Sequence, residues 1–273
     1  MSVTGVAPAR GGSGGSGGGA WRGFAHVSAL TRRNLLQIKA DPDSLFDILL
    51  MPVIYTVLFV YVFGGAVAGS QKEYVQYVMP GLMAMMAVNI AMTAGVGINS
   101  DFKTGVMDRL RSLPIHRASV LSAKVVVECG RMAAATAVLL GVAFLLGMEV
   151  PGGPLGLLGA VGLTGLFGVA LLWVSVLLGL ALKSPQAVQG LGMVAVLPLQ
   201  FGSSVFAPTA TMPGWLQAFT DVNPLSNLAD GCRALINTGS ASTGTVLTAV
   251  GWSLGVMLVT VPAAVSLFGR SGR

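Results

Sequence analysis

The sequence predicts an all-α polytopic membrane protein with six transmembrane helices, and three observations lead to this fold class. Of its 273 residues, 53% are hydrophobic and only 10% are charged, whereas a soluble domain carries about 25% charged residues. The mean hydropathy is +0.78. The apolar residues also gather in stretches of about 20, the length of a helix that crosses the hydrocarbon core of a bilayer.

Six apolar stretches are long enough to cross the membrane as helices. The fifth is the least regular, because Pro198 and Gln200 interrupt its apolar run. Glycines at a spacing of three, from Gly156 to Gly168, predict a stripe of close helix packing on the fourth. The predicted spans are residues 45–68, 78–99, 123–147, 155–182, 187–207 and 245–268.

The residues before the first span divide into two parts. Residues 1–20 are rich in Gly and Ser and contain no apolar core, so they predict a disordered tail and not a signal peptide. Residues 21–40 place apolar side chains on one broad helical face, which predicts an amphipathic interfacial helix. The alternative for this segment is a poorly ordered basic lead-in. Residues 21–273 then form one six-span domain.

Basic residues are distributed unevenly between the two faces of the predicted bundle. Thirteen of the 16 Lys and Arg residues fall on one face, only Lys72 and Arg233 fall on the other, and Arg131 lies inside a span. Positive residues concentrate on the cytoplasmic face, so both termini are expected in the cytoplasm. The high Gly, Ala and Val content is typical of a bacterial protein, which places the chain in a bacterial plasma membrane. No basic cluster with interleaved aromatic residues suggests a nucleic-acid partner.

Residues 101–117 form the one long charged run between two spans. Ser100 or Asp101 can cap a helix, and Val106 and Leu110 follow at helical spacing, so a short amphipathic helix is predicted that stops before Pro114. At a tight turn on the inner face, such a helix can seat in a groove of a soluble subunit and pass its motion to two spans. The alternative is an ordinary charged loop.

The same charged run resembles a motif of type-2 ABC exporter permeases. It reads D-x-x-x-G-x-x-D-x-L-x-x-x-P from Asp101 to Pro114 and is similar to the family's E-x-x-x-G-T-L-E-x-L-x-x-T-P. The chain departs from that motif at Val106 and Met107, where the family has Thr-Leu, and it has Asp in place of Glu at 101 and 108. These acidic replacements keep both the charge and the spacing.

A second match lies far downstream, in the longest predicted outer loop. The sequence reads Pro-Gly-Trp-Leu at 213–216, Asn-Pro-Leu at 223–225 and Arg at 233, and it is similar to the P-x-W-L, N-P-L and L-R pattern of the same family. The two motifs occur in the family's order among the six spans. The chain therefore resembles the daunorubicin-resistance-type (DrrB-like) membrane subunits over nearly its whole length.

The resemblance implies a membrane subunit of an ATP-driven exporter of a hydrophobic or amphiphilic drug, antibiotic or secondary metabolite. It implies a homodimer or a pair with a related permease, which binds two copies of a soluble ABC ATPase subunit. The implied ATPase-coupling residues are Asp101, Gly105, Val106, Asp108, Arg109, Leu110, Leu113 and Pro114. The implied outer-gate residues, in re-entrant helices before the last span, are Pro213, Trp215, Asn223, Pro224 and Arg233.

This chain itself is expected to be no enzyme and to bind no cofactor. A phosphate-binding loop reads G-x-x-x-x-G-K-[ST], and none of the five lysines follows a glycine. ATP and Mg²⁺ are therefore expected to be used by the partner subunit. The two cysteines show no metal-ligand spacing, so no metal site is predicted.

Several polar or flexible side chains lie inside the predicted spans. Glu128 and Arg131 share one helix face, which indicates either a structural ion pair or a role in substrate passage. The methionines of the second span indicate either core packing or an adaptable apolar site, and polar residues of the fifth are candidates to contact an amphiphile. The candidate pathway residues are Met86, Asn89, Thr93, Glu128, Arg131, Gln200 and Ser203.

Three rival functions follow from the same features. A lipid or polysaccharide exporter would share the same motifs, and membrane lipid contacts such a chain in either case. An ion-coupled secondary transporter needs deep acidic residues and internal repeats, but only Glu128 lies deep. A membrane enzyme needs a catalytic set, and the sequence contains no Ser/His/Asp set, paired carboxylates or HExxH motif.

Overall fold

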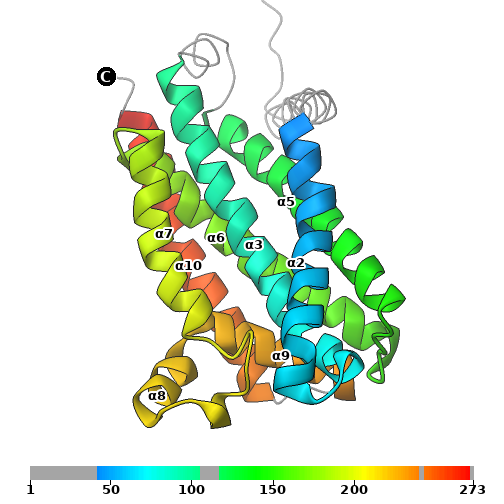
Figure 1. The fold of residues 1–273 in the computed structure, drawn as a ribbon. Coiled ribbons are helices and arrows are strands. Elements are labelled where there is room, and N and C mark those ends of the chain that lie inside the picture. The colour runs from blue at the N-terminus through cyan, green and yellow to red at the C-terminus, as the bar shows by residue number, and fades with distance from the viewer. Residues whose placement is uncertain (1–41, 105–116, 240–242, 271–273) are drawn as a thin grey trace, which may run out of the picture.

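In the computed structural model, the described residues, 42–104, 117–239 and 243–270, are helical apart from short connections (Figure 1). The predicted tail 1–20, the interfacial helix 21–40 and most of the predicted coupling helix lie outside them. The helices are α2 (Pro42–Ala68), α3 (Gln71–Lys103), α5 (Arg117–Leu145), α6 (Gly153–Ala181), α7 (Pro185–Phe201), η1 (Thr209–Thr211), α8 (Gly214–Val222), α9 (Pro224–Thr238) and α10 (Thr243–Arg270).

Five helices in the described part of the chain are long and apolar enough to cross a membrane. They are α2, α3, α5, α6 and α10, and they coincide with five of the six predicted spans to within two residues at the ends of α5 and α6. The remaining span, predicted at 187–207, coincides with α7, which has only 17 residues and ends at Phe201. At 1.5 Å per residue, α7 is about 26 Å long, a little shorter than the hydrocarbon core of about 30 Å. By length and composition, the described residues therefore contain five candidate spans, and the sixth stays a prediction.

Three helix boundaries differ from the prediction. α3 begins at Gln71 instead of residue 78, because the Ser70 side chain caps it by accepting the backbone N–H of Glu73 at 3.2 Å. It also continues to Lys103, so Asp101 lies in its last turn. The prediction that Ser100 or Asp101 caps a separate helix is therefore wrong, because both residues lie within α3. α5 begins at Arg117 instead of residue 123.

The centre of the bundle is α3, the most buried of the candidate spans. It packs against α6 through small residues that bring the two backbones together. A Cβ atom on Gly95 would stand 2.8 Å from the carbonyl oxygen of Ser175, and one on Gly179 would stand 2.6 Å from that of Gly95. Small residues permit this close approach of membrane helices. α2 and α10, in contrast, leave most of their apolar side chains at least partly exposed.

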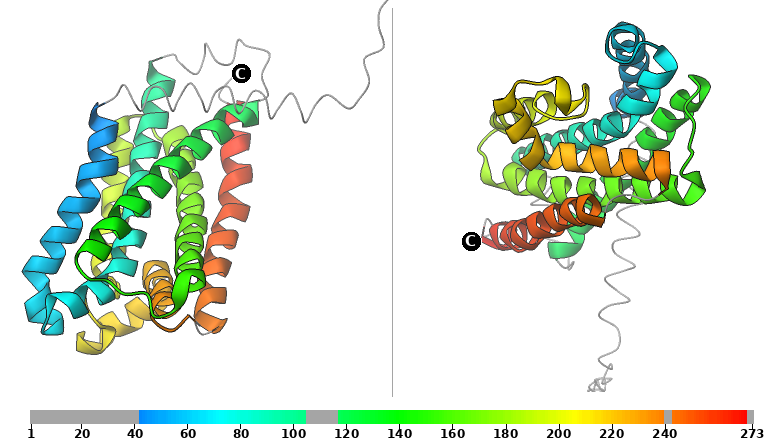
Figure 2. Two further views of the ribbon diagram at one scale, coloured as in Figure 1. Left: turned by 90° about the vertical axis from the view of Figure 1, so that its right-hand side faces the viewer. Right: turned by 90° about the horizontal axis from the view of Figure 1, so that it is seen from below.

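The two ends of the bundle are built differently. The start of α2, the end of α3, the start of α5 and the end of α10 lie together at the upper end of Figure 1. At the opposite end, which we call the α9 end, α8 and α9 lie across the bundle (Figure 2). Successive long helices run in opposite directions, so the segments that connect them alternate between the two ends of the bundle (Figure 1). The charge count assumed the same division of the connecting segments.

Gly152, the N-cap of α6, and Gly156 in its first turn form the surface on which α9 packs. Cβ atoms on Gly152 and Gly156 would each stand 2.2 Å from the carbonyl oxygen of Leu235, so no larger residue fits there. Gly239 ends α9 with a positive φ of 70° and packs on Gly152. The predicted glycine stripe is thus a packing surface in part. A Cβ atom added at Gly156, Gly159 or Gly168 would meet a neighbouring helix, whereas one added at Gly162 or Gly165 would meet nothing within 4 Å.

Gly156→Ala is expected to destabilise the protein by about 1–3 kcal/mol, because the added methyl group collides with rigid backbone. Gly162→Ala is the matched control on the same helix. It faces open space and is expected to be neutral or stabilising by up to about 1 kcal/mol through helix propensity. Thermal unfolding of the purified variants compares them, and equal melting temperatures would contradict this packing.

Candidate functional site

Arg233 joins three segments at the α9 end. Its Nη1 pairs with the carboxylate of Asp230, one turn earlier on α9. Its Nε donates to the carbonyl of Tyr77 on α3 at 3.1 Å, and its Nη2 donates to the carbonyl of Ser204, just after α7, at 3.1 Å. The guanidinium also lies 3.9 Å from the centre of the Tyr77 ring. We call Arg233, Asp230, Tyr77 and Ser204 the Arg233 cluster.

Asn223 ends one helix and begins the next. Its Oδ1 accepts the backbone N–H of Leu225 at 3.0 Å, and so it caps α9. Its Nδ2 donates to the carbonyls of Leu199 at 2.8 Å and Gly202 at 2.9 Å, at the C-terminal end of α7. Pro224 follows at the first helical position of α9, where its missing N–H has no cost. One buried amide therefore sets the end of α7 and the start of α9.

The other two predicted outer-gate residues lie apart from these contacts. Pro213 precedes α8, and the side chain of Trp215 on α8 is 75% exposed. An exposed tryptophan next to apolar helices suits an anchor at the membrane interface. The five predicted outer-gate residues therefore divide into two sets. Asn223 is buried and Arg233 half-buried, and both link helices, with Pro224 between them at the start of α9. Pro213 and Trp215 are exposed, on or beside α8.

Sequence reasoning missed the first two turns of α3, which it placed in a loop. Tyr74 there donates its hydroxyl to the carbonyl of Phe206 at 3.1 Å, and Tyr77 donates its own to that of Ser204 at 2.8 Å. Gln76 binds the carbonyl of Glu149 at 2.8 Å. The S-x-x-E capping pattern at Ser70 was the signal that could have found this helical extension.

A salt bridge lies beside this extension, between α3 and the connection that precedes α6. A hydrogen bond from Lys72 at 2.6 Å, and then the charge of Lys72, lower the pKa of the Glu149 carboxyl from its usual value. Both side chains are about two-thirds exposed. Such a pair contributes little to stability.

Glu128 and Arg131 form a buried ion pair on α5. Arg131 Nη1 lies 3.0 Å from Glu128 Oε2, and the side chains are only 9% and 7% exposed, respectively. The predicted pairing of these residues is confirmed. A role of this pair in substrate passage stays a prediction.

A cavity of about 520 Å³ lies between α2, α3, α5 and α7. Its wall includes five of the predicted pathway residues, which come from three helices. Glu128 lies behind Arg131, outside the lining, and Ser203 is occupied in a hydrogen bond to the carbonyl of Gln200 at 2.5 Å. The predicted pathway residues that line the cavity are Met86, Asn89, Thr93, Arg131 and Gln200.

The cavity has a wall that sequence reasoning did not include. Met51, Tyr55 and Phe59 of α2 line it, together with Phe206 beyond α7. The rings of Phe59 and Phe206 stack at 4.7 Å between centroids. The spacing of four residues along α2 places its three side chains on one helix face, and this pattern was the available signal.

The predicted coupling residues Gly105, Val106, Asp108, Arg109, Leu110, Leu113 and Pro114 lie outside the described residues. The two helix ends that flank them are tied together, because Asp101 on α3 forms a salt bridge with Lys124 on α5. Asn99 donates its amide hydrogens to the carbonyls of Gly179 at 2.8 Å and Leu182 at 2.6 Å, at the end of α6. The ends of three helices are therefore joined next to this segment.

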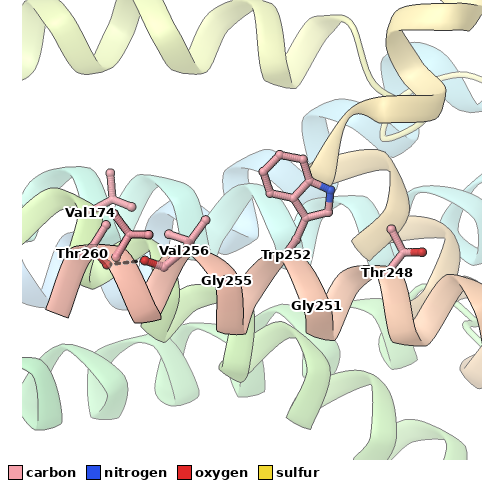
Figure 3. Close-up of a pocket in the computed structure, with 8 residues that line it drawn as sticks. Val174, Thr248, Gly251, Trp252, Gly255, Val256 and Thr260 are labelled. Carbon is pink, nitrogen blue, oxygen red and sulfur yellow. Dashed lines mark hydrogen bonds between the residues drawn. The ribbon is translucent and has the colours of Figure 1, made fainter. Parts of the chain in front are cut away.

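An open apolar groove of about 690 Å³ runs along α10, with Val174 of α6 at its edge (Figure 3). Trp252 stands beside Gly251 and Gly255 on the floor. The hydroxyls of its two threonines, at 248 and 260, donate within α10 at 2.9 and 2.8 Å. Because these two hydroxyls are satisfied within the helix, the groove offers a mainly apolar surface.

A family profile of the ABC-2 type transporter matches residues 25–237 of this chain. The chain belongs to the ABC-2 type transporter family. It is 35% identical over 236 residues to the daunorubicin resistance ABC transporter permease protein DrrB1 of Streptomyces coeruleorubidus, a match that covers 86% of this chain and 80% of the relative.

Two further relatives carry the same kind of name. The putative transport permease ycf38 of Cyanophora paradoxa is 27% identical over 218 residues, 77% of this chain and 74% of the relative. The probable doxorubicin resistance ABC transporter permease protein DrrC of Mycobacterium tuberculosis is 24% identical over 237 residues, 86% and 85%. This ABC-2 chain is therefore a multi-pass membrane permease, as its motifs predicted.

Proposed function

We propose that this chain is the transmembrane subunit of an exporter that moves a hydrophobic or amphiphilic compound out of a bacterial cell. The compound would be a drug, an antibiotic or a secondary metabolite. The names of DrrB1 and DrrC as drug-resistance permeases support this substrate class. The cavity of about 520 Å³ also falls within the 300–1,000 Å³ typical of sites for drug-sized ligands.

A separate soluble ABC ATPase would supply the energy, using ATP and Mg²⁺ that this chain does not bind. Two ATPase copies would dock on a dimer of this chain, or on a pair with a related permease. The observation that carries this mechanism is the joining of α3, α5 and α6 beside residues 105–116, through Asp101 with Lys124 and through Asn99. A push on that segment would therefore reach three helices together.

We also propose that α7 is the sixth span and that both termini are cytoplasmic. The charge asymmetry of the sequence supports this orientation. α7 is nearly long enough, and it exposes Leu191, Val194 and Phe201 by 49%, 71% and 67%. Such a surface requires lipid or a second protein chain, which fits both a sixth span and the dimer. Cysteines introduced at positions 2 and 272 are labelled with a membrane-impermeant thiol reagent in intact and in permeabilised cells. Labelling only after permeabilisation supports cytoplasmic termini.

Leu110→Asp is expected to weaken binding of the ATPase at least about tenfold, because an unpaired charge would enter an apolar contact. The chain is co-expressed with candidate ATPase subunits, recovered by its tag, and assayed for bound ATPase and ATP hydrolysis. The matched control is Ser112→Asp, which adds the same charge two positions later, about 200° around a helix.

The outcome separates a coupling subunit from other transporters. Loss of binding in Leu110→Asp alone, with Ser112→Asp intact, supports the coupling role. Equal behaviour of both folded variants would contradict it. Vesicles that contain the complex are then tested for ATP-dependent movement of several amphiphiles, and the exporter proposal fails if none of them moves.

A further inference from the structure

Asn89 is the accessible residue in the middle of α3. Every other residue from Val78 to Ala91 is buried, whereas Asn89 is partly exposed and lines the cavity between α2, α3, α5 and α7. It lies about 27 Å from the start of α3 and about 21 Å from its end. Within the described part of the chain its amide makes no hydrogen bond, and neither the amide oxygen nor the nitrogen is buried. Because this face of α3 borders the cavity, the amide opens into it.

Two further polar side chains lie on the same part of the wall. Gln189 on α7 is exposed, lines the cavity, and makes no hydrogen bond through its amide to a described residue. Thr93 lies one turn after Asn89; its hydroxyl donates to the Asn89 carbonyl at 3.0 Å, and its oxygen can still accept. α7 packs against this part of α3, since a Cβ atom on Gly192 would collide with the side chain of Met92. Hydrogen-bonding groups of two helices therefore border this part of the cavity.

Aromatic residues line the other part of the cavity. The ring centroids of Phe59 and Phe206 are 4.7 Å apart, and those of Phe206 and Phe201 are 5.7 Å apart. Phe201 is the last residue of α7 and follows Gln189 by 12 residues, which is about 18 Å along a helix. The cavity is therefore amphipathic along its length, with amides toward the start of α7 and aromatic rings toward the α9 end. Such rings offer large apolar contact areas at fixed geometry.

The charge of the wall is balanced. Arg131 is the charged residue among those that line the cavity, and Glu128 lies against it at 3.0 Å. A cationic ligand would meet the guanidinium, whereas an anionic ligand would compete with Glu128 for it. A neutral ligand leaves the buried pair intact, and breaking such a pair is costly.

We propose that this cavity binds an uncharged amphiphile whose head both donates and accepts hydrogen bonds, as an amide or a hydroxyl group does. The Asn89 amide binds the head, Gln189 and Thr93 border it, and the aromatic residues hold the apolar part toward the α9 end. Such an occupant satisfies an amide that is unfavourable when unpaired among apolar groups. The inference deepens the proposed function by naming the class of cargo and its orientation, and it rests on that function only in calling the ligand a cargo.

Two probes of nearly the same shape isolate the contribution of the head. Naphthalene-2-carboxamide carries an uncharged amide on an apolar ring system, and 2-isopropylnaphthalene carries a group of similar size that forms no hydrogen bond. Equilibrium binding of each is measured to the purified full-length chain in lipid nanodiscs, with empty nanodiscs as the background. The ratio of the two dissociation constants is compared between variants, because the partition of each probe into lipid and its loss of hydration cancel in that comparison.

Asn89→Leu is the decisive variant, since it keeps the approximate size of the side chain and removes its donor and acceptor. It is expected to reduce the preference for the carboxamide about fivefold to tenfold relative to the wild type, the effect of one hydrogen bond. Its melting temperature reports that it is folded. An unchanged ratio in the folded variant would overturn the proposal. If Asn89→Leu does not fold, Asn89→Ala decides the outcome by the same ratio.

A matched pair of glutamines tests the orientation of the ligand. Gln186 and Gln189 are both exposed and lie three residues apart on α7, but of the two it is Gln189 that lines the cavity. Gln189→Leu is expected to reduce the preference for the carboxamide at least about twofold, whereas Gln186→Leu is expected to retain it in full. Equal ratios in the two folded variants would contradict the placement of the head at this end.

Charged probes test the neutral class. Naphthalene-2-carboxylate has the shape of the carboxamide with a negative charge, and 2-naphthylmethylammonium carries a positive charge. Each is expected to bind at least about tenfold more weakly than the carboxamide, and equal or tighter binding of either would contradict the neutral class. Light scattering in detergent gives the oligomeric state of the same variants. If Asn89→Leu converts a dimer to a monomer and leaves the probe ratio unchanged, a second copy of the chain satisfies the amide and the proposal fails.

These measurements separate the site from the exporter function. Binding is measured without an ATPase subunit and without ATP, so it stands or fails independently of coupling. If the ATPase binds and is sensitive to position 110 but Asn89→Leu keeps the preference for the carboxamide, only the site is wrong. If Asn89 selects the carboxamide but no ATPase binds, the site stands and the exporter proposal fails.

Discussion

Arg131→Ala is expected to destabilise the protein by about 3–5 kcal/mol, because it leaves the buried carboxyl group of Glu128 without its cation. The two side chains are 9% and 7% exposed and 3.0 Å apart on α5. Neither the low-dielectric surroundings nor the apolar neighbours can replace the lost interaction. Thermal unfolding in a fixed detergent measures the loss, which should exceed that of any exposed ion-pair variant.

The double variant Glu128→Gln with Arg131→Met is the control that interprets this loss. Removing both charges is expected to recover most of the stability, since a buried pair replaced as a unit is often nearly neutral. A double variant no more stable than Arg131→Ala would contradict the ion-pair account. The exposed pair of Lys72 and Glu149 gives the reference, because Lys72→Ala is expected to cost less than about 1 kcal/mol.

The same double variant decides between the two roles of the pair. If stability and transport both recover, Glu128 and Arg131 hold the fold and do nothing further. If stability recovers but transport does not, the charges act in passage of the substrate. Because Arg131 lines the cavity and Glu128 does not, the second outcome would point to Arg131 as the residue near the cargo.

Asn223→Ala is expected to destabilise the protein by about 2–4 kcal/mol. The change removes the cap of α9, which contributes about 1 kcal/mol. It also removes the donor to the carbonyls of Leu199 and Gly202, and the second of these bonds is itself buried. Leaving such acceptors without a donor costs further free energy. Chemical denaturation or thermal unfolding of the purified protein measures the total.

Asn223→Asp separates the two functions of this amide. Aspartate is as good an N-cap as asparagine, so the bond from Leu225 is kept. Its carboxylate cannot donate, and it would face two carbonyl oxygens at the end of α7. The aspartate variant is therefore expected to be at least as unstable as the alanine variant. If it matches the wild type instead, the contact with α7 contributes nothing.

Local sequence patterns were sufficient for several features of this protein. A spacing of three on one helix brings Glu128 and Arg131 together whatever the tertiary structure, and the same spacing on α9 pairs Asp230 with Arg233. The family resemblance predicted re-entrant helices before the last span; the structure has α8 and α9 there, and their entry into a membrane stays a prediction. These features depend on neighbours in sequence, and local propensity carries that information.

Other features arise only from contacts between distant segments. The helical extension at Tyr74 and Tyr77 is stabilised by carbonyls more than 120 residues away, and α7 ends at Phe201 beside an asparagine 22 residues further along the chain. No periodicity within 187–207 indicates that end. The structure also placed Asp101 inside α3, because the helix continues to Lys103 and its Phe102 packs on Phe268 of α10, with ring centroids 5.7 Å apart.

The sequence by itself determined that this is a helical membrane protein, that its motifs occur in the order of an ABC-2 permease, and which charged residues are neighbours on a helix. Composition, period and spacing are properties of the chain before it folds. Only the tertiary structure decided that α2 supplies aromatic rings to a cavity beside Gln200, and that Arg233 spans α3 and α9. These arrangements depend on which helix faces pack together, because a close contact is possible only where small residues allow it.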